Sequence, residues 1–185
     1  ERPGLVDVSA IVERVDAEGS RFRLLGFDRA ASVELRLVGR RHVSHALAAA
    51  ALAWSLHLDV DAVVAGLESV SGVAGHLESV DAGQDFDVRI DAAQDPTSLA
   101  QALATLRSVF GGRLLLVLSA EGGQDRATRR ALAHVAETAA DRVVLTLGSP
   151  RSEDPNQVMD DMLGGFRRPG RVHVEPDRRR AIDAA

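Results

Sequence analysis

The sequence predicts an α/β protein in which a doubly wound, mostly parallel sheet forms the C-terminal part and a β-rich, then helical, region precedes it. In the second half of the chain, short apolar runs rich in β-branched residues alternate with longer runs of helical character. This alternation is typical of a parallel sheet with helical crossovers. The start of the chain instead consists of strand-like runs between turn-forming clusters, and hydrophobic residues make up 45% of the chain, enough for a substantial core.

The N-terminal region contains three predicted strands followed by two helices. The strands are separated by turns at 16–19 and 28–30, where Asp and Gly residues gather. An alanine-rich run at 46–53 predicts that the first helix is buried on most sides, and Asp59 is a suitable N-cap for the second. The predicted strands are Val6–Val15, Arg21–Gly26 and Ser32–Val38, and the predicted helices are Val43–Leu56 and Asp59–Glu68.

Small residues at 70–75 predict a linker between two domains. After it, four predicted strands alternate with helices, and we expect these apolar strands to be buried on both faces. The strands are Phe86–Ile90, Arg113–Leu118, Arg142–Leu147 and Arg171–Val174, and the helices are Pro96–Phe110, Asp125–Ala140, Asp154–Leu163 and one opening at Asp177. A doubly wound sheet would normally continue after that helix, and the chain begins with Glu1 rather than Met, so we expect a chain cut at both ends.

Composition narrows the classes of function. The formal net charge is −5, which argues against a nucleic-acid or anionic-membrane partner. The chain has no cysteine, which excludes disulfides and thiolate metal sites and is compatible with a cytoplasmic protein. No apolar run approaches the roughly 18 residues of a membrane span. Arginine supplies all 22 basic residues, because lysine is absent.

Polar, turn-forming residues follow three of the predicted strands. The three segments are 91–96, 119–126 and 148–155. Ligands of open α/β sheets bind at the carboxyl ends of the strands, so we expect these segments to meet at one rim. Taken singly, each segment is also an ordinary way to leave a strand.

Five segments resemble motifs of the Mur ligases, in the same order and with similar spacing over essentially the whole chain. Gly39–Ala49 is similar to G-x-[HF]-N-V-x-N-A-L-A-A, and Gly75–Glu78 to G-R-x-E. Asp91–Pro96 resembles D-Y-A-H-T-P, Gly148–Pro155 resembles D-N-P-R-x-E-x-P, and Asp177–Ile182 resembles D-R-x-x-A-I. The nearest branch adds the third peptide residue, often diaminopimelate, to UDP-N-acetylmuramoyl-L-alanyl-D-glutamate. An unrelated Rossmann-like binding domain is a further alternative, but Gly39–Ala49 argues against it.

The resemblance implies that residues 1–72 are the tail of a Mur central domain and that 73–185 form a Rossmann-like C-terminal domain that ends before its last strand. It also implies an ATP- and Mg²⁺-dependent reaction of peptidoglycan synthesis, in which a substrate carboxylate is phosphorylated and the amine of a diamino acid then displaces phosphate. The partners would be the UDP-N-acetylmuramoyl-peptide and the diamino acid. The family's P-loop and modified lysine cannot be in a chain without lysine, and its terminal G-K-G-H-E loop is missing. We therefore expect no activity, no bound cofactor and no catalytic or metal-binding residue in this fragment alone.

By the same resemblance, Arg151 would grip the carboxylate of the added amino acid, since its planar fork suits a two-point contact. Ser149, Glu153 and Arg126 would share that site. The alternative for Arg151 is a surface ion pair with Glu153 or Asp154. Asp91, Gln94 and His76 would lie beside the nucleotide. The alternative for the first two is a strand-to-helix turn in which Asp95 caps the helix at Pro96.

Departures from the family gather at ligand-facing positions. Gly148 and Ser149 replace the Asp-Asn of D-N-P-R, and only Arg151, Glu153 and Pro155 survive in that motif. Ala92 and Gln94 replace a tyrosine and a histidine, and His76 replaces an arginine. Gly123-Gln124 replaces the Asp-Arg of G-G-D-R-D unless a short shift restores Asp125-Arg126. A degenerate, non-catalytic Mur-like binding or assembly module is therefore the alternative function.

Three further groups could carry chemistry. His42 and His45 replace asparagines and are spaced to share a helix face, but with no third ligand we favour capping and interdomain packing over a metal site. Glu121-Gly122-Gly123 could present backbone amides to an anion, although a flexible loop is favoured because Glu121 would repel a phosphate. Arg178–Arg180 opens a helix, and a solvated face is favoured there.

Overall fold

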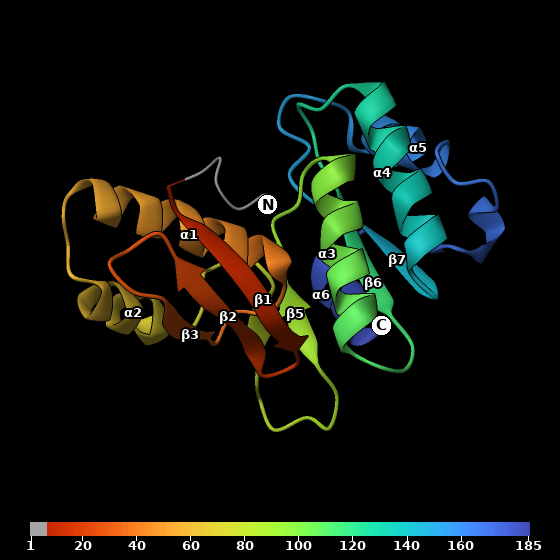
Figure 1. The fold of residues 1–185 in the computed structure, drawn as a ribbon. Helices are drawn as coiled ribbons and strands as arrows, with labels where there is room; N and C mark the ends of the chain where they lie inside the picture. The colour runs from red at the N-terminus through yellow and green to blue at the C-terminus, as the bar shows by residue number, and fades with distance from the viewer. Residues whose placement is uncertain (1–6) are drawn as a thin grey trace. The chain divides into compact units, whose positions relative to one another are not determined.

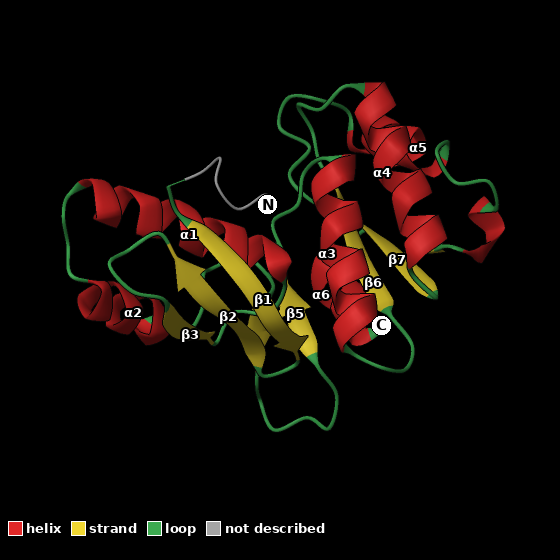
Figure 2. Ribbon diagram, in the orientation of Figure 1, coloured by secondary structure: helices red, strands yellow, loops and turns green. Residues whose placement is uncertain are grey.

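A computed structural model describes residues 7–185 and divides the chain into two compact units between Ala92 and Ala93 (Figures 1 and 2). Val6, the first residue of the first predicted strand, lies outside the described residues. Each unit has its own hydrophobic core. The predicted boundary at 72/73 stays a prediction, and the segment 70–77 around it contains no helix or strand.

The first unit begins with a three-stranded antiparallel sheet of order β1-β2-β3, built from β1 (Ser9–Asp16), β2 (Gly19–Leu25) and β3 (Ala31–Leu35). Phe22 and Leu24 on β2 and Val33 on β3 are fully buried, as the alternating pattern requires. Gly19 has φ of 148° where β1 turns into β2, and a β-carbon there would overlap the carbonyl of Leu35. All three predicted strands are therefore present, with ends shifted by a few residues.

Two helices cover this sheet: α1 (Arg40–Ser55) packs on β1 and β2, and α2 (Val60–Ser69) packs on β3. The prediction that the first helix is buried on most sides is wrong. Its buried residues lie on one face, whereas Leu52 is 64% exposed. The alanines explain the error, because alanine favours helix at exposed and buried positions alike. Asp59 caps α2 as predicted, accepting hydrogen bonds from Asp61 N and Ala62 N.

The strand predicted at Phe86–Ile90 forms, but it does not begin the parallel sheet. It is shortened to β5 (Val88–Ile90) and pairs antiparallel with β4 (Glu78–Val80), a strand that was not predicted. Neither face of β5 is fully buried, and Phe86 is 66% exposed. The physical reason is that only a short loop, residues 81–87, separates β4 from β5, so their pairing costs little loop-closure entropy.

The second unit contains the predicted parallel sheet, with strand order β6-β7-β8. Its strands are β6 (Leu115–Ala120), β7 (Arg142–Leu147) and β8 (His173–Val174), and its helices are α3 (Pro96–Val109), α4 (Arg126–Ala139), α5 (Pro155–Leu163) and α6 (Arg178–Asp183), with a short 3₁₀ turn η1 (Pro169–Arg171). Each α-helix begins directly after an aspartate whose side chain accepts a backbone N–H of the first turn: Asp95, Asp125, Asp154 and Asp177. Arg178–Arg180 is exposed, as expected.

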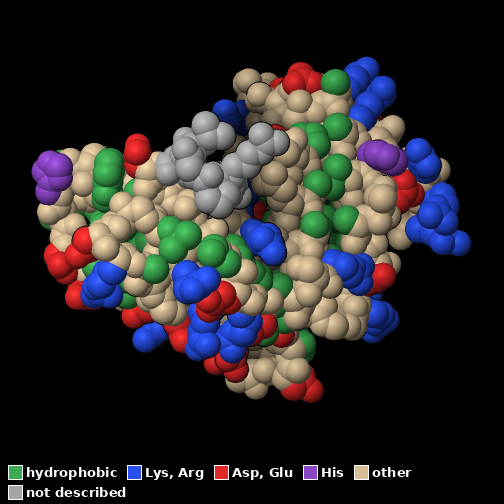
Figure 3. Space-filling view, in the orientation of Figure 1, with side chains coloured by type: hydrophobic (Ala, Val, Ile, Leu, Met, Phe, Trp, Pro, Cys, Tyr) green, Lys and Arg blue, Asp and Glu red, His purple; other side chains and the backbone are tan. Residues whose placement is uncertain are grey.

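The core of the second unit lies between the sheet and the helices α4 and α5, which pack on β6 and β7. Val144 and Leu145 on β7 are almost completely buried, but both residues of β8 are exposed, so the expected burial on both faces fails for that strand. The helices α3 and α4 pack side by side and leave a shallow apolar groove, where Figure 3 shows hydrophobic atoms. Within residues 7–185, no helix combines the length and apolar character that crossing a bilayer requires.

Candidate functional site

The carboxyl ends of β6 and β7 bring two of the three predicted loops together. The loop after β6 begins with Glu121, and the loop after β7 begins with Gly148. Two backbone hydrogen bonds join the loops, from Gly148 N to Ala120 O at 2.9 Å and from Gly122 N to Ser149 O at 2.8 Å. Because the strands are parallel neighbours, this contact follows directly from the topology.

The third predicted loop is divided between the two units. Gln94 belongs to the second unit, where its carbonyl accepts a hydrogen bond from Nε2 of Gln124 at 2.8 Å. Asp91 belongs to the first unit, and its Oδ2 accepts the amide of Leu77 at 3.0 Å. The exposed His76 is the neighbour of Leu77, so Asp91 and His76 lie on one turn of the first unit.

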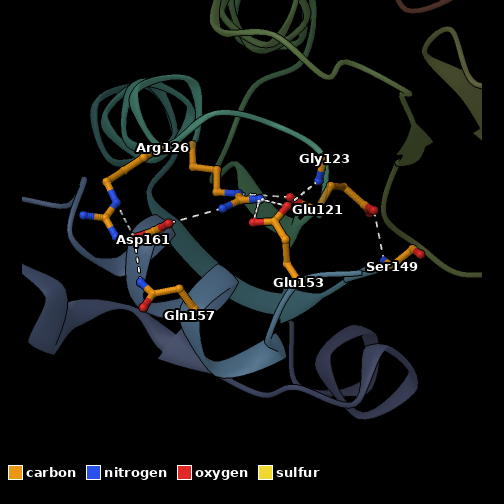
Figure 4. Close-up of polar contacts among 8 residues, drawn as sticks. Glu121, Gly123, Arg126, Ser149, Glu153, Gln157 and Asp161 are labelled. Atoms are coloured by element: carbon orange, nitrogen blue, oxygen red, sulfur yellow. Dashed lines mark hydrogen bonds and ion pairs between the residues drawn. The ribbon is translucent and has the colours of Figure 1, made fainter. Parts of the chain in front are cut away.

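A buried arginine connects the two joined loops to helix α5, through Glu121, Glu153 and Asp161, which Figure 4 labels. Arg129, on α4, is only 2% exposed. Its Nη2 donates to both carboxylate oxygens of Glu153 at 2.7 Å, its Nη1 to Oδ2 of Asp161 at 3.2 Å, and its Nε to the carbonyl of Glu121 at 3.1 Å. Each polar group of this arginine is thereby matched, as burial of a charge demands.

Two of the predicted site residues are held by this network. Oε1 of Glu153 also accepts the amide of Gly123 at 2.6 Å, and the bonds from Arg129 and Gly123 lower the pKa of Glu153 below its ordinary value. Arg126 pairs through Nε with Oδ1 of Asp161 at 2.8 Å, while its side chain stays 58% exposed. Glu153 thus fixes the loop rather than presenting a free carboxylate.

Arg151 is an exposed cation of this rim. The surface ion pair considered for it does not form: Glu153 binds Arg129, and Asp154 caps α5 through Asn156 N at 2.9 Å. Within residues 7–185, the side chain of Arg151 makes no ion pair or hydrogen bond. Its backbone has φ of 55°, in the left-handed region, and Nη1 lies 3.1 Å from where a β-carbon of Gly123 would be.

The amides that could have formed an anion site after β6 are already bonded. Gly122 N donates to Ser149 O and Gly123 N to Glu153. Glu121 itself accepts the amide of Ser149 on Oε2 at 2.9 Å. The anion interpretation of Glu121-Gly122-Gly123 is therefore not supported by the geometry, and the loop is tied down rather than flexible.

The two histidines of α1 differ in burial, because His45 is the more exposed of the two. His42 is buried, with Nδ1 2.8 Å from the carbonyl of Val38, and its ring lies perpendicular to that of His45 with centroids 6.0 Å apart. The pKa of His45 is lowered, chiefly by burial and further by nearby positive charges that include His42 and His76. No three histidine or acidic side chains in the described part of the chain are grouped to hold a metal ion.

Arg129 and Asp161 were missed in the sequence, although a signal for Arg129 exists. Arg129, Leu132, Ala133 and Ala136 are the buried residues of α4, at positions i, i+3, i+4 and i+7. An arginine on the apolar stripe of a helix is rarely buried without a partner, so its position indicates an internal ion pair. The partners lie 24 and 32 residues away and carry no local signal.

The part of the chain that carries these loops matches a known family. Residues 75–185 match the family model described as "Mur ligase, glutamate ligase domain". The chain belongs to the Mur ligase family. The Mur motif at Gly148–Pro155 is the loop that Arg129 holds, and the Mur motif at Gly39–Ala49 opens α1, where Gly39 has φ of 106°.

Individual relatives agree with this assignment. The chain is 38% identical over 177 residues to the UDP-N-acetylmuramoyl-L-alanyl-D-glutamate–2,6-diaminopimelate ligase of Geobacillus kaustophilus, covering 95% of this chain and 36% of that protein. A solved structure of a ligase of the same name matches 98% of the chain and 37% of its own, with 29% identity and a TM-score of 0.61. A folylpolyglutamate synthase from Mycobacterium tuberculosis, complexed with ADP and AMPPCP, shares 28% identity over 98% of this chain and 41% of its own, with a TM-score of 0.81. The chain thus spans about a third of the length of its curated relatives.

Proposed function

We propose that this chain forms the C-terminal part of an ATP-dependent Mur ligase that adds diaminopimelate to a UDP-N-acetylmuramoyl-peptide. The observation that carries the proposal is the exposed Arg151, which has no ionic partner among residues 7–185 and lies on a loop that is fixed at both ends. Relatives named as diaminopimelate ligases match along nearly the whole chain. Since the chain spans about a third of them, we propose that it does not catalyse the reaction by itself.

In this proposal Arg151 binds a carboxylate of the incoming amino acid. A guanidinium offers two parallel N–H groups to a carboxylate, and a fixed backbone reduces the entropy lost on binding. Diaminopimelate, with a second carboxylate, is favoured over lysine for this reason. Ser149 is exposed beside Arg151, and Arg126 is half exposed on the first turn of α4, so both can contribute polar contacts. Glu153 acts indirectly, by holding the loop.

ATP would supply the phosphoryl group that activates the substrate carboxylate. Gln94 and His76 are exposed and able to donate hydrogen bonds to a nucleotide, and Asp91 holds the turn that carries His76. Phosphoryl transfer needs concentrated positive charge. This chain has no lysine, and its described residues offer no grouped metal ligands. The groups that hold Mg²⁺ and the phosphates therefore belong, in our proposal, to the rest of the enzyme, which would work in the cytoplasm, where ATP is made.

The test is ATP-dependent phosphate release by the full-length ligase with Mg²⁺ and the UDP-N-acetylmuramoyl-dipeptide. Diaminopimelate, lysine and no amino acid are compared. Arg151→Ala should raise the KM for diaminopimelate at least about tenfold, equivalent to about 1.4 kcal/mol. Arg179→Ala, an exposed arginine on α6, is the matched control and should leave the KM unchanged.

Phosphate release that requires diaminopimelate, with the KM raised in Arg151→Ala but not in Arg179→Ala, supports the ligase. A well-folded enzyme that turns over no amino acid would refute it and leave the degenerate Mur-like module. The altered D-N-P-R motif, with Gly148 and Ser149, is the observation that keeps this second candidate in view.

A further inference from the structure

A side chain at position 148 is excluded by the neighbouring carboxylate of Glu121 and not by the backbone conformation of Gly148. It follows β7 directly and stands where Mur ligases carry the aspartate of D-N-P-R. Its φ is not among the positive values of this chain, so its backbone does not require glycine. A β-carbon at Gly148 would instead overlap Oε1 of Glu121 and lie 2.8 Å from Oε2.

The carboxylate of Glu121 therefore fills the space that an aspartate side chain at 148 would enter. Glu121 follows β6, the parallel neighbour of β7, and the ends of the two strands are held in register by the bond from Gly148 N to Ala120 O. From there its Oε2 accepts the amide of Ser149 at 2.9 Å, as Figure 4 shows. One carboxylate thus lies at the start of the Arg151 loop, supplied by the adjacent strand.

We propose that Glu121 replaces the missing aspartate of the D-N-P-R motif, so that the carboxylate has moved from the end of β7 to the end of β6. The inference rests on the proposed ligase function. Glu121 is then a positioning residue: it orients the amide of Ser149 and, through the turn, the guanidinium of Arg151 two residues later. The exchange keeps the negative charge of the rim while changing the strand that carries it. Gly148 leaves room for the carboxylate of Glu121, so glycine at this position does not indicate a loss of ligase function.

The experiment is a reciprocal exchange in the full-length ligase. Glu121→Ala and Gly148→Asp are made singly and together, with Gly111→Asp as the control, because a β-carbon at Gly111 would meet no atom within 4 Å. Each variant is assayed for the KM of diaminopimelate, the KM of ATP, kcat and the urea midpoint. Each single change should lower kcat/KM for diaminopimelate about tenfold, and the double variant should recover to within about threefold of wild type.

Rescue in the double variant is a result that two independent structural defects do not produce. If the double variant loses the product of the two single effects, the proposal is overturned. If Gly148→Asp folds only when Glu121 is also replaced, the proposal stands; if the double variant also fails to fold, it falls. If the wild-type enzyme shows no ligase activity, the proposed function is refuted. The urea midpoints still test the exchange in that case, because Gly148→Asp should destabilise the protein only in the presence of Glu121.

Discussion

Replacing Arg129 tests whether the network beneath the rim stabilises the second unit. The variant is Arg129→Met, which keeps an apolar stem of similar length and removes the four hydrogen bonds of the guanidinium. Removing one partner of a buried ion pair typically costs about 3–5 kcal/mol, because the other charge stays buried. Asp161, whose side chain is 7% exposed, is the charge left behind.

The expected loss lies at the lower end of that range, at about 3 kcal/mol. Asp161 keeps two other donors, Nε of Arg126 at 2.8 Å and Nε2 of Gln157 at 3.0 Å. Urea denaturation measures the effect as a lower midpoint with an unchanged slope. The matched control is Arg130→Met, the exposed neighbour on the same helix, which should change stability by less than about 0.5 kcal/mol.

A second variant tests whether the loss of stability arises from the unpaired carboxylate of Asp161. Combining Arg129→Met with Asp161→Leu removes both buried charges and should recover part of the lost stability, because neither charge then remains unpaired. If Arg129→Met lies within about 0.5 kcal/mol of Arg130→Met, the network does not stabilise the fold. If the double variant is less stable than Arg129→Met, the loss did not arise from a stranded carboxylate.

Two other substitutions in the second unit should also change its stability. Gly122→Ala should destabilise it by about 1–3 kcal/mol, because the added methyl group would overlap the carbonyl of Pro150; Gly111→Ala is the control, and equal urea midpoints would contradict the prediction. The pKa of Glu137 is lowered, chiefly by the amide of Arg167, so its carboxylate stabilises the fold above the unfolded pKa near 4.5 and loses that effect as the pH falls through the lower folded pKa. The difference in urea midpoint between wild type and Glu137→Gln should therefore shrink below pH 4.5, and a difference that stays constant would contradict the prediction.

Local features of this fold could be predicted from the sequence because their causes are local. An aspartate before each helix of the second unit caps it through a backbone amide two or three residues on, and such a signal is contained within one turn. The parallel sheet follows from the alternation of strands and helices, and β7 begins and ends where predicted. The partner of β5 was not predictable in this way, because β4 has only three residues and a weak pattern.

The candidate site could be predicted only in part. The sequence and its resemblance place Ser149, Arg151 and Glu153 on one loop, and the strand order explains why that loop meets the one after β6. The ion pairs of Arg129 join residues 24 and 32 positions apart, and the contact between Glu121 and Gly148 spans 27. Such distances are set by packing, so no local pattern reports them. That Glu153 binds Arg129 and the amide of Gly123 could not be predicted for the same reason, and its part in the amino-acid site stays a prediction.

The hydrogen bonds of the rim show how its two loops are held together within this chain. Three amides face one another across the two loops, those of Gly122, Gly123 and Ser149, and each is bonded within the chain. Two of the acceptors are carboxylates, Glu153 and Glu121, which take the place that an external anion would otherwise fill. The loop is thus ordered before any substrate arrives, and its exposed charge is the guanidinium of Arg151. In our proposal an aspartate at 148 is not needed for this order, because the carboxylate of Glu121 lies where its side chain would begin and accepts the amide of Ser149.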